Sequence, residues 1–292
     1  MAELSIIIVN RNGRDYLGDC LGSVKAASRG RDWETVVVDN ASDDGSPDMV
    51  KRELPDAKLV LNRENAGFAR ANNAAWRKAR APFILFLNPD TRIIGPAVDV
   101  LLGVLRERGE AGACGPLLAR DDGSYQVSFG GRVGFFRELI QKSALNAYYR
   151  RRLRRERCLR DAAWVSGACL LARREALEQA GGFDEDFFLY FEDIDLCVRM
   201  KDRGWKVLFV PQAEVVHLGG GATSAFAPSR YEYRRSQLLY YRKHCSALSR
   251  ALLRGYLRLS FAGLGLRRRL KGEGRAEGPA FSDLLKKGGP GA

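Results

Sequence analysis

The first 118 residues alternate short apolar runs with stretches of helical periodicity, and this pattern constrains the fold most. Continuous Val, Ile and Leu runs separated by helices are typical of a mostly parallel sheet flanked by helices. We therefore expect an α/β fold. The expected strands are Leu4–Val9, Thr35–Val38, Lys58–Leu61, Phe83–Leu87 and Ala113–Leu117, and helices are expected near 15–27, 46–54, 67–79 and 96–108.

Polar side chains follow four of these strands. They are Asn10, Asp39, Asn62 and the segment Asn88-Pro89-Asp90. Because the carboxyl ends of parallel strands meet at one edge of a sheet, ligands of such sheets bind at that edge. The sequence therefore predicts a ligand site formed by these strand ends.

Two short acidic segments lie far apart in the chain. Asp90 closes an apolar strand, and Glu192-Asp193-Ile194-Asp195 interrupts an aromatic stretch. Carboxylates that directly follow core-forming segments cost free energy unless a metal, a donor or a reaction uses them. One segment could hold a divalent cation and the other a base, which suits transfer of a group from a diphosphate.

The remainder of the chain has a less regular pattern. A loop or hairpin is expected over 119–135, a helix over the Arg-rich stretch 137–160, and an apolar run over 162–171. Further expected elements are helices at 173–180 and about 192–203, strands Lys206–Val210 and Glu214–His217, and a Gly219-Gly220-Gly221 loop. We expect a catalytic domain at 1–230 (nucleotide-binding half 1–118, acceptor half 119–230), a basic amphipathic helical extension at 231–275, and a flexible tail at 276–292.

The net charge of +13 is unevenly distributed. Residues 137–160 hold nine Lys or Arg against two Glu, and residues 231–275 hold twelve against two. The other residues together are mildly acidic. Two basic segments on an acidic body indicate an anionic surface as a partner.

Four motifs occur in one order: Asp39-Asn40-Ala41-Ser42-Asp43-Asp44-Gly45, Asn65-Ala66-Gly67-Phe68-Ala69, Leu87-Asn88-Pro89-Asp90 and Phe191-Glu192-Asp193-Ile194-Asp195. In this combination the chain resembles the family 2 inverting glycosyltransferases of the GT-A (Rossmann-like) fold, particularly their bacterial rhamnosyltransferase-like branch. The resemblance covers roughly residues 3–245, and four ordered motifs are more specific than any single one. It implies transfer of one sugar from a nucleoside-diphosphate sugar.

The resemblance assigns the donor site to the first half of the chain. It implies that Asp39 contacts the nucleotide base, that Asn10 contacts the nucleoside, and that Asn88 touches ribose. Asp90 would bind Mg²⁺ or Mn²⁺ together with His217, since these ions need few protein ligands beside phosphate and water. The helix opening at Asn65-Ala66-Gly67 would face the diphosphate with its free N–H groups, and Asn72 would lie nearby.

The acceptor side is assigned to the second half. The resemblance implies that Asp193 is the general base that takes the proton of the attacking hydroxyl. Glu192 would orient the base or the acceptor, and Asp195 would cap or pair within its helix. The small residues Gly167, Ala168 and Cys169 would line the acceptor side. Each motif also has a purely structural reading, as a turn, a helix N-cap or tight strand packing.

The basic segment from Gln237 to Gly263 has an amphipathic helical pattern. Lys243, Arg250, Arg254 and Arg258 share one stripe, with Leu238, Tyr241, Cys245, Leu248, Leu252, Tyr256 and Leu259 opposite. Such a helix is typical of a membrane-surface element, although it could instead pack on the catalytic body. His244 is expected at the surface.

The expected activity is transfer of one sugar, rhamnose first, from dTDP-rhamnose or a UDP-sugar to a lipid-linked or envelope-glycan acceptor. With no signal-like segment and no apolar run of roughly 18–20 residues, we expect a cytoplasmic protein peripheral on the inner face of the membrane. Two alternatives stay open. One is an inactive sugar-nucleotide-binding protein. The other, disfavoured because RNA-binding motifs are missing, is a basic nucleic-acid-binding protein.

Overall fold

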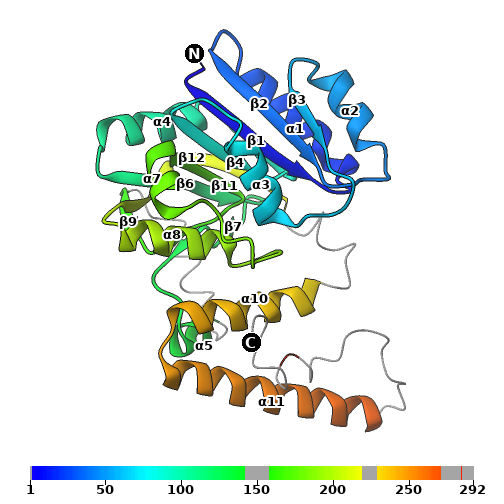
Figure 1. Cartoon of the computed structure of the whole chain (residues 1–292), viewed down its shortest axis with the longest axis vertical. Coiled ribbons are helices and arrows are strands. Elements are labelled where there is room, and N and C mark those ends of the chain that lie inside the picture. Colours follow the sequence, from blue (N-terminus) through cyan, green and yellow to red (C-terminus); the bar gives the residue numbers. More distant parts are fainter. Residues whose placement is uncertain (1, 142–157, 219–228, 271–283, 285–292) are drawn as a thin grey trace.

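The computed structural model describes residues 2–141, 158–218, 229–270 and 284, and it is built around one large sheet (Figure 1). The strands are β1 Leu4–Asn10, β2 Trp33–Asp39, β3 Lys58–Leu61, β4 Phe83–Leu87, β5 Thr91–Ile93, β6 Ala111–Ala119, β7 Tyr125–Gln126, β8 Phe129–Gly130, β9 Arg160–Ala162, β10 Trp164–Val165, β11 Cys169–Arg173 and β12 Lys206–His217. The helices are α1 Arg14–Ala27, α2 Ser46–Glu53, α3 Phe68–Trp76, α4 Ala97–Glu107, α5 Phe135–Gln141, α7 Arg174–Ala180, α8 Glu192–Asp202, α10 Ser229–His244 and α11 Ala247–Leu270.

The sheet is mostly parallel, as the sequence predicts. Its strand order is β3-β2-β1-β4-β11-β6-β12-β5, and β3, β2, β1 and β4 run parallel to one another. Strand β11 lies antiparallel between β4 and β6, and β6 pairs parallel with β12. The five expected strands of the first half are all present. The α/β fold is therefore confirmed.

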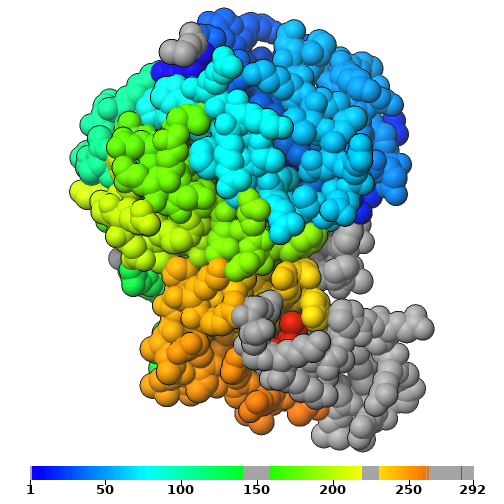
Figure 2. Space-filling model, in the orientation of Figure 1, coloured from blue at the N-terminus to red at the C-terminus, as the bar shows by residue number. Residues whose placement is uncertain are grey.

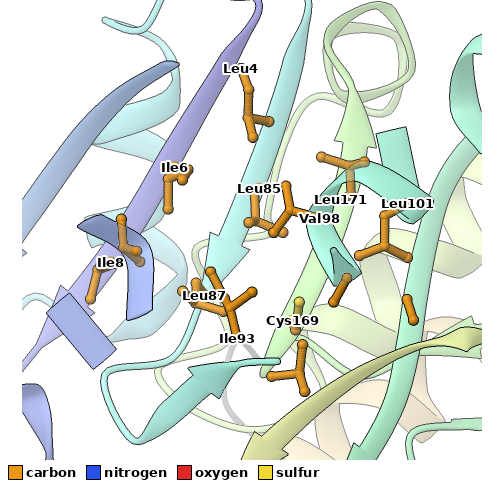
Figure 3. Close-up of a cluster of buried hydrophobic side chains, with 14 of the residues drawn as sticks. Leu4, Ile6, Ile8, Leu85, Leu87, Ile93, Val98, Leu101, Cys169 and Leu171 are labelled. Atoms are coloured by element: carbon orange, nitrogen blue, oxygen red, sulfur yellow. The ribbon is translucent and has the colours of Figure 1, made fainter. Parts of the chain in front are cut away.

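Alternate residues of the central strands face two separate hydrophobic cores. Leu4, Ile6 and Ile8 of β1 pack in one core with residues of α1 and α4. Ile7 and Val9 pack in the other core with residues of α3, α7 and α8. Because side chains of a strand alternate between faces, helices on both sides are needed to cover β1. Figure 3 shows the first core.

Two strand pairings bring distant segments to one edge of the sheet. In the β4–β11 pair, Leu87 lies opposite Cys169, and the Asn88 N–H donates to the Ala168 carbonyl at 2.9 Å. In the β5–β12 pair, Thr91 lies opposite His217. The segment that follows β4 is therefore held next to both the small-residue segment and the end of β12.

Two expectations for the stretch from 137 to 217 need correction. The two strands expected at 206–217 form one strand, β12, because a bulge between Val210 and Glu214 lets it continue along β6. A helix is expected over 137–160, but the chain is not helical at the end of this range: residues 160–162 form strand β9, which pairs with β12. Its middle part, 142–157, lies outside the described residues.

The C-terminal segment forms two helices, so a single amphipathic helix over 237–263 is wrong. α10 ends at His244 and α11 begins at Ala247. α10 packs on the body: its residues Leu238, Leu239, Tyr240 and Tyr241 are buried with Phe187 and Phe191. The side of α10 away from the body carries α11 (Figures 1 and 2).

His244 is not a surface residue as expected. Its Nε2 lies 2.6 Å from a carboxylate oxygen of Asp195, which is fully buried in α8 and also pairs with Arg199. The pairing of Asp195 within its helix is confirmed. Among the described helices, none is long and apolar enough to cross a membrane. The Gly219-Gly220-Gly221 loop, and the tail 276–292 apart from Leu284, lie outside the described residues.

Candidate active site

A cleft of about 630 Å³ opens at the carboxyl edge of the sheet. It brings together residues of both acidic segments, which is the arrangement that the sequence predicts. The sequence-predicted site residues that line it are Asn65, Gly67, Asn88, Asp90, Gly167, Ala168, Glu192, Asp193 and His217.

Asp193, near the start of α8, is held in the cleft by backbone donors. Its carboxylate accepts the N–H of Gly167 at 2.7 Å and the N–H of Ile194 at 2.8 Å. A Cβ at position 167 would lie 3.1 Å from the Cβ of Asp193, so glycine keeps the space beside the carboxylate free. Burial raises the pKa of Asp193, although the two N–H groups act to lower it.

Glu192 lies beside Asp193 and is deeply buried. Burial, together with the neighbouring Asp193 charge, raises the pKa of Glu192 well above its usual range. Its Oε2 atom has no hydrogen-bond partner among the described residues. Both carboxyl groups of this adjacent pair therefore keep their protons to higher pH than exposed carboxyl groups do, while the two backbone N–H groups favour the ionised form of Asp193.

Gln126 of β7 fixes the ring of His217. The His217 carbonyl can only accept, so the Gln126 atom 2.6 Å away is the amide nitrogen. The Gln126 carbonyl oxygen then lies 2.8 Å from His217 Nδ1, which must carry the proton. In the neutral ring Nε2 is left with a lone pair, and it lies 3.3 Å from Asp90 Oδ1.

The chemistry around Asp90 and His217 fits a divalent cation. Two acceptors 3.3 Å apart repel each other unless a cation or a proton lies close to both. Asn88 adds an amide whose nitrogen lies 3.5 Å from His217 Nε2. Within the described ranges no group of three or more His, Cys, Asp or Glu is placed so that it could hold a metal ion. Protein ligands as few as these suit Mg²⁺ or Mn²⁺ carried on a nucleotide diphosphate.

The start of α3 differs from the expectation. The N–H of Gly67 is donated to the Asn65 side chain at 3.1 Å, and the N–H of Phe68 to the Phe188 carbonyl at 2.8 Å. These two groups are therefore not free for a diphosphate, which corrects that part of the prediction. Gly67 has a φ of 81°, and a Cβ there would lie 2.7 Å from Phe188, so glycine permits this contact.

Four predicted site residues do not line the cleft. Asn72 donates to the Phe68 carbonyl one helical turn earlier, at 2.9 Å. Cys169 points into the hydrophobic core beside Leu87 and Ile93 (Figure 3). Asn10 and Asp39 are buried and bonded to each other at 3.2 Å, and Asp39 also accepts the Ser42 N–H. These side chains have structural partners, and the predicted nucleotide contacts of Asn10 and Asp39 stay predictions.

Sequence reasoning missed several residues that line the cleft: Arg11, Asn40, Glu138, Trp164, Phe188, Tyr190, Glu232 and Tyr233. Arg11 is the one Lys or Arg in the described lining, and its position directly after β1 could have indicated a phosphate contact. Asn40 directly follows β2 in the same way. Glu138, Trp164, Glu232 and Tyr233 gave no local signal, because their place in the cleft depends on how β10, α5 and α10 pack.

The segment before α8 is strained. Tyr190 and Phe191 have φ values of 70° and 68°, a region that residues other than glycine rarely adopt and that costs on the order of 1–3 kcal/mol each. α10 holds the segment in place: Ser236 donates to the Leu189 carbonyl at 2.7 Å, and Phe191 packs on Tyr233 and Tyr240. Tyr190 is thereby placed in the cleft, three residues before Asp193.

A sugar-nucleotide transferase is the class of protein that this fold and cleft define, and comparisons with known proteins agree. Residues 5–181 match the family described as Glycosyl transferase family 2. The chain belongs to this family. It is 31% identical over 279 residues to the N-acetylglucosaminyl-diphospho-decaprenol L-rhamnosyltransferase of Mycobacterium tuberculosis, covering 89% of this chain and 90% of the relative.

Two further likenesses extend over most of the chain. It is 25% identical over 249 residues to the rhamnosyltransferase WbbL of Escherichia coli, covering 81% of this chain and 91% of that protein. The fold resembles the mannosyltransferase PcManGT of Pyrobaculum calidifontis, solved with GDP-Man and Mn²⁺, at a TM-score of 0.59 and 19% identity, over 98% of this chain and 79% of that one. The GT-A glycosyltransferase fold is therefore confirmed.

Proposed function

We propose that this glycosyltransferase is metal-dependent and inverting, and that it moves one hexose from a nucleoside-diphosphate sugar to an acceptor hydroxyl. Two relatives carry rhamnosyltransferase names, which supports dTDP-rhamnose as the first donor to test, with UDP-sugars next. An N-acetylglucosaminyl-diphospho-lipid or another envelope glycan is the proposed acceptor, following the printed name of the mycobacterial relative.

The observation that carries this proposal is a short hydrogen-bonded connection between the two acidic segments. Asn88 is bonded to Ala168, and the next residue back, Gly167, donates to Asp193. The segment with Asp90 and the segment with Asp193 thus line one cleft from different parts of the chain. Inversion requires a base on the face of the sugar opposite the leaving diphosphate, and this arrangement suits that requirement.

Each residue then has a defined task. Asp193, ionised and held by two N–H donors, accepts the proton of the attacking hydroxyl and contributes roughly 10²–10⁴-fold. Arg11 and Asn88 contact the donor, and Asp90 and His217 would hold Mg²⁺ or Mn²⁺. When bound, the ion offsets negative charge that develops on the leaving diphosphate. Glu192 contacts the acceptor beside the base.

A thermal-shift screen of nucleotide sugars with and without Mn²⁺ tests the donor site. The cognate donor is expected to raise the melting temperature only with the ion, because a ligand bound to the native state stabilises it by mass action. Donor binding with neither hydrolysis nor transfer would instead favour the inactive sugar-nucleotide-binding alternative. A shift produced equally by all nucleotides without metal would contradict the proposed donor site.

The pH dependence tests which carboxylate is the base. Because the pKa of Asp193 is raised, and only the ionised form accepts a proton, the acid limb of kcat/KM should lie above pH ~4, the ordinary aspartate range. Activity is lost as the pH falls through the raised pKa. Glu192→Gln mimics the protonated neighbour, so this variant should keep the acid limb. Disappearance of the limb in Glu192→Gln would make Glu192 the base.

The outer helices suggest how the enzyme reaches a lipid-linked acceptor. On α11, Leu248 and Leu259 are 66% and 77% exposed, and Arg250, Arg254 and Arg258, which lie on the other side of the helix, are exposed as well. A helix that exposes both leucines and basic residues suits an anionic membrane surface, which attracts each basic residue by about 1 kcal/mol. We include this surface in the proposed function.

Liposome flotation tests membrane contact. The wild-type protein should float with anionic vesicles, and Leu248→Asp with Leu259→Asp should reduce binding by more than roughly tenfold, since burying each leucine contributes about 1.5–3 kcal/mol. Leu61→Asp is the matched control, because Leu61 is 58% exposed on the edge strand β3. Equal flotation of all three proteins would leave α11 with a packing role only.

A further inference from the structure

The cleft continues beyond Asp193 into a part that the donor-binding half of the chain does not build. We call this part the outer lobe and define it by Val133, Glu138, Trp164, Tyr190, Glu232 and Tyr233. They come from β10, α5, α10, the loop before α5 and the segment before α8. Tyr233 of α10 is a wall of this lobe, so the C-terminal helix contributes directly to the site.

The outer lobe combines aromatic faces with hydrogen-bond acceptors. The rings of Tyr190 and Tyr233 meet edge to face with centroids 5.7 Å apart. The indole of Trp164 lies against β8, where a Cβ at Gly130 would come within 2.8 Å of it. Aromatic rings pack on the apolar C–H faces of a pyranose, and carboxylates accept hydrogen bonds from its hydroxyls.

One buried carboxyl oxygen beside this lobe lacks a partner. Among the described residues, Glu192 Oε2 makes no hydrogen bond. Glu192 lines the cleft and is more than nine-tenths buried. Buried polar groups without partners are rare in native proteins, and at a cleft they indicate positions that a ligand satisfies.

The charge of the outer lobe limits the kind of ligand. Its charged residues in the described lining are Glu138 and Glu232, and no Lys or Arg lines it there. Glu138 accepts the Tyr241 hydroxyl at 2.9 Å, and Glu232 pairs with Arg235 at 3.3 Å. Because the lining offers no cation that could hold a phosphate, the lobe suits an uncharged sugar rather than the diphosphate of a lipid-linked acceptor.

We propose that the outer lobe binds the uncharged terminal sugar of the acceptor, with Tyr233 of α10 packing on that sugar beside Asp193. This inference rests on the proposed glycosyltransferase function and names the part of the acceptor that the site recognises. It gives α10 a role in substrate recognition that is independent of any membrane contact.

Acceptor kinetics of three variants test this role. Tyr233→Ala should raise the acceptor KM by roughly tenfold, while the affinity for dTDP with Mn²⁺ stays unchanged. Tyr233→Phe keeps the ring and should stay near wild type. Tyr231→Ala is the matched control, because Tyr231 is a half-buried tyrosine of the same helix that does not line the cleft.

Two probes identify the part of the acceptor that is recognised: an N-acetylglucosaminyl diphosphate with a short alkyl chain, and the alkyl N-acetylglucosaminide without phosphate. Tyr233→Ala should raise KM by the same factor for both probes. An unchanged acceptor KM, an equal effect of Tyr231→Ala, or an effect confined to the diphosphate probe would overturn the inference while donor binding remains intact. A wild-type protein that binds no donor would overturn the proposed function and this inference with it.

Discussion

Asp193→Asn is expected to lower the rate of sugar transfer by roughly 10²–10⁴-fold, while nucleotide affinity stays within about twofold. Asparagine keeps one carbonyl oxygen that can accept a backbone N–H from Gly167 or Ile194, so the start of α8 should keep its position. It cannot accept the proton of the attacking hydroxyl. Initial rates with saturating donor and acceptor measure the loss, and calorimetric titration with dTDP and Mn²⁺ measures the affinity.

Asp202→Asn is the matched control for this variant. Asp202 is the last residue of α8 and is exposed, with an ion pair to Arg132 at 3.0 Å. The same chemical change at the other end of the same helix should leave transfer unaffected. Undiminished turnover in Asp193→Asn would remove the assignment of Asp193 as the base, and a parallel loss in both variants would indicate a general effect on the helix.

Asp90→Ala is expected to weaken metal-dependent nucleotide binding by on the order of 100-fold. The substitution removes one of the two side chains that the described structure offers to the cation. Loss of a group that only supports a metal ligand already lowers metal affinity by about 10–100-fold, so loss of a ligand should cost at least as much. Nucleotide titrations of wild type and variant, with Mn²⁺ and with EDTA, measure this effect. The variant with Mn²⁺ should resemble the wild type with EDTA.

Asp121→Ala is the control for the loss of an acidic residue. Asp121 lies in the exposed turn between β6 and β7 and pairs with Arg92, so its removal should not change nucleotide affinity. If the wild-type protein binds its nucleotide equally well in EDTA, the proposed metal dependence is contradicted, whatever the variants do.

The fold of the first half could be predicted because its strands are continuous apolar runs with local signals at each end. The chemistry of carboxylates beside apolar segments predicts a cation-binding role for one acidic segment and a base for the other. The order of the strands in the sheet could not be predicted from such local signals. β11 lies antiparallel between β4 and β6, and its position depends on packing over the whole sheet.

The errors in the site have the same physical origin. The family resemblance places Gly167, Ala168 and Cys169 together on the acceptor side, but the side chain of Cys169 points into the core with Leu87. The basic stretch around His244 predicts a surface residue, whereas His244 reaches the buried Asp195 from another helix. Such contacts between distant segments leave no periodic pattern in the sequence.

A crystal structure of the protein with dTDP and Mn²⁺ tests the central claim most directly, because the anomalous signal of manganese locates the ion independently of the nucleotide. We predict manganese bound by Asp90 and His217, the diphosphate on the ion, and Asp193 across the same cleft. A nucleotide bound elsewhere, or an ion held by neither residue, would contradict the account.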